Sequence, residues 1–241
     1  MISPAAAGPR EMERDRRIGG IFGIVFGASL LTVPFASYSS GTTAAENLST
    51  FDLNRAIFAF VMNGITVLFA FLYAIYLRTA LWPRGPTLVT AATAFFLMGI
   101  LIISGSTLYQ ASAMATLSSV YNATTSSTAD RAAAVVAAQV VQNNGVAFLG
   151  FALGIPLGIA LFGLAMRNSR IIPNGIGYVG IALGIFVLVG VPLVVLVGFA
   201  SAAGFVLFLG FLTLVWIWTF GSAAFLWRSA RKVPTGEPAP A

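Results

Sequence analysis

One stretch of the chain, residues 171–227, contains no charged residue. A membrane-spanning helix needs about 20 mainly apolar residues, so this stretch is too long for one span and long enough for two. In the whole chain 58% of residues are hydrophobic and only 8% are charged, whereas a soluble domain has about 25% charged residues. So few charges cannot cover a water-facing surface, and the chain is therefore expected to be an integral membrane protein.

The apolar runs predict an all-α membrane protein, a bundle of six transmembrane helices. The small-residue segment 198–204 is expected to form the turn between the last two spans. We expect the spans at residues 18–37, 56–77, 87–107, 144–166, 176–197 and 204–227. The membrane domain, residues 18–232, is expected to follow a cytoplasmic tail at 1–17 and to precede a Pro-rich, disordered tail at 233–241.

Basic residues concentrate on one side of the predicted bundle. Six spans place both termini on the same side as the second and fourth loops, and the opposite side holds only Arg55 and Arg131 of the 13 Lys and Arg residues. Cytoplasmic loops carry the excess of Lys and Arg. The sequence thus predicts a multi-pass protein of the cell membrane with both termini in the cytoplasm. Tyr73, Tyr76 and Trp82 are expected at the inner headgroup boundary, where amphipathic rings concentrate.

The outer segment between the third and fourth spans, residues 108–143, is longer than a connecting loop requires. Residues 132–166 carry no charge, and a single helix of that length would extend about 52 Å, whereas the hydrocarbon layer is about 30 Å thick. We therefore expect the third and fourth helices to extend outward as a helical hairpin. Thr128 or Asp130 is expected to be the N-cap of its second arm.

Three of the predicted spans carry glycines at helical spacing. Such small-residue faces let membrane helices approach closely. The candidate helix-packing residues are Gly20, Gly23 and Gly27 in the first span, Gly150, Gly154 and Gly158 in the fourth, and Gly177, Gly180 and Gly184 in the fifth. We expect these faces to pack against other helices of the same chain, and contact with another subunit is the alternative.

Residues 158–173 read GIALFGLAMRNSRIIP and run into Gly177 and Gly184, and residues 17–21 read RIGGI. These segments resemble a family of uncharacterised prokaryotic multispan membrane proteins known only as a domain of unknown function. In that family a similar helix–Arg–Ser–Pro–Gly turn joins two late spans. The resemblance concerns the layout of most of the chain, and it implies a multispan bundle with no assigned activity. The long outer hairpin departs from that layout.

The sequence offers few groups that could carry chemistry. It has no Cys and no His, which removes thiolate nucleophiles, the commonest general base and the commonest metal ligand. No Asp, Glu, Lys or Arg lies inside a predicted span, although such residues usually mark proton and ion pathways. We therefore expect no catalytic residue, no metal, no cofactor and no enzyme activity. Because the basic residues are explained by membrane orientation, no nucleic-acid partner is expected.

Two groups of amides are candidate polar sites. Asn63 lies inside the second span, and its side chain either binds a ligand or makes an interhelical hydrogen bond of about 0.6 kcal/mol, which is the favoured interpretation. On the outer hairpin, Gln139, Gln142 and Asn143 would share one helix face because of their spacing.

Two N-x-[ST] sequons fall on the predicted outer side of the membrane. They begin at Asn47 and Asn122, and they are candidate glycosylation sites. Sequons are short, however, and often arise by chance.

The missing chemistry and the interaction-ready surfaces favour a non-catalytic role. The leading hypothesis is an accessory or scaffold subunit of a larger membrane assembly, whose partners are the lipid bilayer and other membrane subunits or a second copy. The alternative is a transporter or channel for a neutral or lipophilic solute, which needs no intramembrane charge. A water-accessible cavity that reaches Asn63 would favour the alternative. An enzyme acting on lipid is a third hypothesis.

Overall fold

The computed structural model describes residues 9–31, 43–142, 150–167, 169, 171–197 and 202–230. Of these residues 92% are helical and none lies in a strand, which confirms the all-α prediction for the described part of the chain. In chain order the helices are α1 (Pro9–Leu30), α2 (Ala44–Ser49), α3 (Leu53–Leu81), η3 (Trp82–Arg84), α4 (Pro86–Asn122), α5 (Thr128–Gln142), η4 (Gly150–Gly154), α7 (Ile155–Arg167), α8 (Asn174–Val197) and α9 (Ala202–Ala230).

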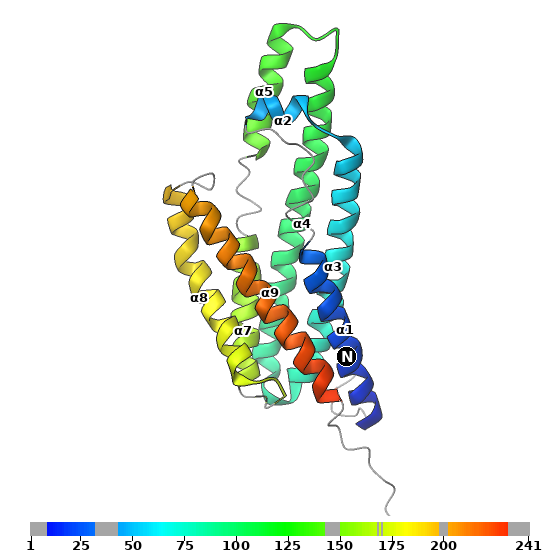
Figure 1. The fold of residues 1–241 in the computed structure, drawn as a ribbon, viewed down its shortest axis with the longest axis vertical. Helices are drawn as coiled ribbons and strands as arrows, with labels where there is room; N and C mark the ends of the chain where they lie inside the picture. The colour runs from blue at the N-terminus through cyan, green and yellow to red at the C-terminus, as the bar shows by residue number, and fades with distance from the viewer. Residues whose placement is uncertain are drawn as a thin grey trace, which may run out of the picture.

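Six of these helices form a ring in which neighbours in the sequence are also neighbours in space. Contacts join α1 to α3, α3 to α4, α4 to α7, α7 to α8 and α8 to α9, and extensive contacts between α9 and α1 close the ring. The start of α1 and the end of α9 lie at the same end of the molecule, where the turn between α3 and α4 also lies (Figure 1).

Three described helices are long and apolar enough to cross a membrane: α3, α4 and the Leu209–Ala230 part of α9. Two further apolar segments, Ile155–Arg167 and Asn174–Gly190, are shorter. The chain thus has the helices that a membrane protein needs. At the N-terminus, α1 begins at Pro9, so that part of the predicted tail, residues 1–17, extends the first helix instead of forming a separate segment.

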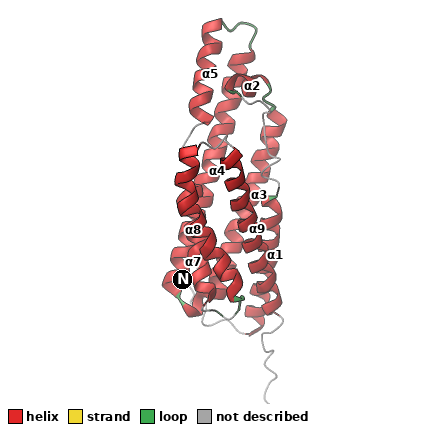
Figure 2. Cartoon of the chain, turned by 60° about the vertical axis from the view of Figure 1, so that its left-hand side comes forward, coloured by secondary structure: helices red, strands yellow, loops and turns green. Residues whose placement is uncertain are grey.

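The second half of α4 packs against α5, and the short helix α2 packs against both. In Figures 1 and 2 these helices extend beyond the ends of α1, α8 and α9. Leu48, Met114 and Ala138 form the fully buried centre of this second apolar cluster. The Ser118 hydroxyl also donates a hydrogen bond of 2.8 Å to the carbonyl of Leu48 and thereby fastens α2 to α4. The sequence pattern did not reveal α2.

The N-cap of α5 differs from the one expected. Ser127, and not Thr128 or Asp130, caps the helix, because its Oγ accepts a hydrogen bond of 3.2 Å from the Asp130 N–H. The Asp130 carboxylate accepts hydrogen bonds from Ser127 Oγ at 2.7 Å and from the Ser127 N–H at 2.9 Å. These two bonds from Ser127 hold the pKa of Asp130 below its usual value.

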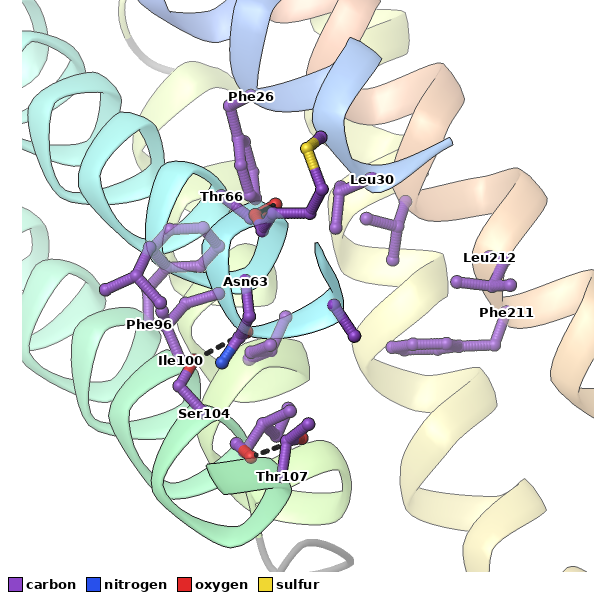
Figure 3. A pocket seen from close by; sticks show the side chains of 16 residues that line it. Phe26, Leu30, Asn63, Thr66, Phe96, Ile100, Ser104, Thr107, Phe211 and Leu212 are labelled. Atoms are coloured by element: carbon purple, nitrogen blue, oxygen red, sulfur yellow. Dashed lines mark hydrogen bonds between the residues drawn. The ribbon is translucent and has the colours of Figure 1, made fainter. Parts of the chain in front are cut away.

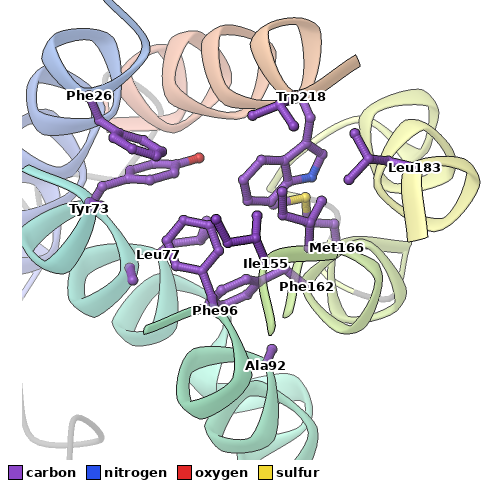
Figure 4. Close-up of a cluster of buried hydrophobic side chains, with 14 of the residues drawn as sticks. Phe26, Tyr73, Leu77, Ala92, Phe96, Ile155, Phe162, Met166, Leu183 and Trp218 are labelled. Carbon is purple, nitrogen blue, oxygen red and sulfur yellow. The ribbon is translucent and has the colours of Figure 1, made fainter. Parts of the chain in front are cut away.

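Aromatic side chains from five helices fill the centre of the ring (Figure 4). Phe26, Tyr73, Phe96, Phe162 and Trp218 are each at most 2% exposed. Phe26 and Phe96 meet edge to face, with ring centroids 6.0 Å apart and an interplanar angle of 88°, an arrangement that aromatic pairs favour. Tyr73, which was expected among the aromatics of the headgroup boundary, instead belongs to this core.

All nine glycines expected to support helix packing lie close to a neighbouring helix. A Cβ atom at any of them would come within 3.0 Å of an atom on another helix of this chain. The face of α1 meets α9, the glycines of η4 and α7 meet α4, and the face of α8 meets α7 and α9. Two glycines absent from the expected set are partners in these contacts: Gly99 lies against Gly154, and Gly163 against Gly177.

Candidate ligand-binding cavity

A cavity of about 170 Å³ lies between α1, α3, α4, α7 and α9 (Figure 3). The last turns of α1 contribute Phe26 and Leu30, and α9 contributes apolar residues that include Phe211 and Val215. All 16 lining residues are uncharged. An engineered apolar cavity of about 150 Å³ in another protein binds benzene, so this space is large enough for a molecule the size of one aromatic ring.

The start of α7 shapes one side of the cavity. Pro156 has no N–H, and its ring would clash with the carbonyl of the residue four positions earlier in a regular α-helix. The five residues Gly150–Gly154 before α7 form a π-helical turn, which relieves that clash by widening the backbone. Such turns are frequent at functional sites, and here the turn leads directly into Ile155, which lines the cavity.

The polar part of the cavity wall comes from α3 and α4. Ser104 Oγ on α4 donates a hydrogen bond of 3.2 Å to Oδ1 of Asn63 on α3, which is the interhelical bond that the sequence favoured. Thr66 and Thr107 lie near this pair and donate to the carbonyls of Met62 and Ile103 in their own helices, at 2.8 and 2.9 Å. The structure thus joins Asn63 to a cavity, together with two α4 hydroxyls that the sequence did not connect with it.

A second group of buried polar atoms lies deeper in the ring. The hydroxyls of Tyr73 and Ser222 are 2.5 Å apart, and Ser222 Oγ also donates to the Trp218 carbonyl. Trp218 Nε1 and Thr219 Oγ1 are buried without a hydrogen-bond partner among the described residues. The Tyr73–Ser222 pair was not predicted from the sequence, because a helical period does not show which tyrosine on α3 faces which serine on α9.

The other candidate polar residues lie away from this cavity. Gln139 and Gln142 are exposed on α5 and line no part of it, and Asn143 lies outside the described residues. Asn122 Nδ2 donates to the Leu48 carbonyl at 3.0 Å and to Ser118 Oγ at 3.1 Å. A glycan on Asn122 would have to replace these bonds. Asn47 lies within α2, and both sequons stay predictions.

No family model, no curated protein and no solved structure matches this chain. The resemblance to a prokaryotic domain of unknown function therefore stays a prediction. The geometry of the cavity is accordingly the basis for a functional proposal.

Proposed function

We propose that this chain is a six-span membrane protein that binds a neutral, lipophilic solute in the cavity beside Asn63 and transfers it through the membrane. The observation that carries the proposal is the uncharged, mainly apolar cavity that reaches the Asn63 amide on the long apolar helix α3. A solidly packed bundle would instead have supported a purely structural role. Because the cavity has no charged lining residue, it suits a neutral solute better than an ion.

The six spans would be the six members of the ring, α1, α3, α4, α7, α8 and α9. Pairs of arginine and aromatic residues at helix ends support a cytoplasmic position for the termini. The Arg78 guanidinium lies 4.3 Å from the ring centroid of Trp82, and that of Arg167 lies 5.2 Å from the centroid of Tyr178. Such side chains suit the headgroup level, and the cytoplasmic side of a membrane is the side rich in arginine.

The binding proposal is tested by filling the cavity. Ala59 lines the cavity, so Ala59→Phe should occupy it, whereas Ala94→Phe adds the same bulk on an exposed position of α4. We expect mass spectrometry of the purified wild type and of Ala94→Phe to detect a co-purified neutral lipophile at near-equimolar amount, which Ala59→Phe lacks. Equal amounts in all three proteins, with unchanged melting curves, would contradict binding in this cavity.

A second candidate function is the accessory or scaffold subunit. The observation that favours it is an apolar strip on the outer face of α5, where Val136 and Val140 are 60% and 70% exposed one turn apart. The glycine faces no longer support this role, since they meet helices of the same chain. An accessory subunit should co-migrate with a partner after purification in mild detergent, and Val136→Lys should weaken that association.

A further inference from the structure

We infer that the solute carries one oxygen atom that accepts a hydrogen bond from the Asn63 side-chain amide, on an apolar body no larger than about one ring. This inference rests on the proposed binding function and specifies the chemistry of the same cavity. It follows from which hydrogen-bond donors of the cavity wall already have an acceptor in the protein and which do not.

The hydroxyl protons of the wall are already committed to protein acceptors. Thr66 donates to the Met62 carbonyl, Thr107 donates to the Ile103 carbonyl, and Ser104 donates to Asn63 Oδ1. These three hydroxyls therefore offer only lone pairs to a ligand. No charged group contributes to the lining.

The Asn63 amide nitrogen is the remaining donor. Its Oδ1 accepts the hydrogen bond from Ser104. Its Nδ2 donates no hydrogen bond within the described part of the chain, and Nδ2 is not among the fully buried atoms. Asn63 itself lines the cavity, and Figure 3 shows its amide beside the cavity-lining Ile100 and Ser104. The interhelical bond and ligand binding, which the sequence posed as alternatives, thus use different atoms of one side chain.

The rest of the wall selects for an apolar body. Phe26 and Phe96 form an aromatic floor, and Phe211 and Leu212 of α9 lie on the far side of the cavity from Asn63 (Figure 3). A hydroxyl fits the polar end well, because its oxygen accepts from Asn63 Nδ2 while its proton meets a free lone pair of Ser104 or Thr107. A wholly apolar molecule would leave the half-buried Asn63 amide without an acceptor, and the missing hydrogen bond lowers affinity.

The inference is tested with 4-fluorophenol and 4-fluorotoluene, two probes that differ only in a hydroxyl and a methyl group. Binding to the full chain in phosphatidylcholine nanodiscs is measured by fluorine NMR, with empty nanodiscs subtracted. We expect wild type to bind 4-fluorophenol more tightly, by about fivefold to tenfold, the equivalent of one hydrogen bond. Asn63→Leu, which keeps the branched shape of the side chain and removes its donor, should abolish this preference and leave the affinity for 4-fluorotoluene within about twofold.

Two further variants separate the outcomes. Asn54→Leu, at an exposed position in the first turn of α3, should bind both probes as wild type does, and Ala59→Phe should bind neither. Equal affinity of wild type for the two probes, or a preference that survives in Asn63→Leu, would overturn the role of the amide while binding in the cavity stands. If Ala59→Phe bound both probes as wild type does, the proposed function itself would fail. The wild-type preference needs no variant, so a misfolded Asn63→Leu protein leaves the test intact.

Discussion

At the scale of single residues, hydrogen bonds inside the ring connect helices that are distant in the sequence. Tyr73 on α3 and Ser222 on α9 meet at the centre of the ring, and the Ser222 hydroxyl donates a hydrogen bond to the Trp218 carbonyl. Because Ser222 donates to that carbonyl, Tyr73 acts as the donor to Ser222. The three groups form a hydrogen-bonded chain without any charged member, so that both buried hydroxyls have a partner.

Removing the Tyr73 hydroxyl and removing the Ser222 hydroxyl should have unequal effects. Tyr73→Phe removes the donor and leaves Ser222 bonded to Trp218, so we expect a loss of about 1 kcal/mol in the free energy of unfolding. Ser222→Ala leaves the buried Tyr73 hydroxyl without an acceptor and should cost more, about 1–3 kcal/mol. Unfolding in mixed micelles measures both. The double variant should lose less free energy of unfolding than the sum of the two single losses, and strict additivity would contradict the hydrogen bond between Tyr73 and Ser222.

At the scale of helices, the contact between α4 and α7 depends on backbone meeting backbone. A Cβ atom at Gly99 would collide with the backbone of Gly154 and Ile155. Through this contact the π-helical turn and α7 reach α4, and Ile155 then takes its place in the cavity wall. The geometry of the cavity therefore depends on Gly99, which is not itself one of its lining residues.

Gly99→Ala should thus destabilise the protein by about 1–3 kcal/mol, the usual cost of adding bulk to a filled interior. Gly64→Ala and Gly105→Ala are matched controls in α3 and α4, because a Cβ atom there meets nothing within 4 Å. We expect the two controls to be neutral or to gain up to about 1 kcal/mol, since alanine favours a helix more than glycine does. Thermal melts of the three purified variants measure these effects. Equal shifts of the melting temperature in all three would contradict the close contact between Gly99 and Gly154.

The sequence predicted features that depend on one helix at a time. Periodicity identified Gly154 as part of a packing face, because residues four apart lie on the same side of a helix. It did not identify Gly99, because α4 has no set of three glycines at helical spacing. Only the structure shows that Gly99 lies against Gly154. Asn63 was recognised as a buried amide, but the cavity beside it results from the joint placement of five helices. Helix α2 was missed, because its six residues are too few to show a period.

At the scale of the whole molecule, the six helices of the ring form the body, and α2, α5 and the second half of α4 form a cluster that extends beyond it. α4 contains 37 residues and would be about 55 Å long, so it exceeds the hydrocarbon thickness of about 30 Å. The turn between α4 and α5 and the turn between α3 and α4 lie at opposite ends of the molecule (Figure 1). The proposed topology places these two turns on opposite sides of the membrane.

Single cysteines test that topology without background, because the sequence contains no cysteine. We expect Thr124→Cys, between α4 and α5, to react with a membrane-impermeant maleimide added to intact cells. Thr87→Cys, in the first turn of α4, should react only after the membrane is permeabilised. Both positions are exposed on the protein, so access to the reagent decides the result. Labelling of Thr87→Cys in intact cells would overturn the proposed orientation.

The ring closes through α1 and α9, which are the first and the last of its helices to be synthesised. The glycine face of α1 lies against Ala223, Phe220 and Trp227 of α9, so its partner is the last of the six to leave the ribosome. Until that moment the side of α1 that meets α9 lacks the helix that covers it in the finished ring. A nascent chain arrested before α9 should therefore remain an open arc, in which α1 packs on α3 while the part of its glycine face that meets α9 stays uncovered.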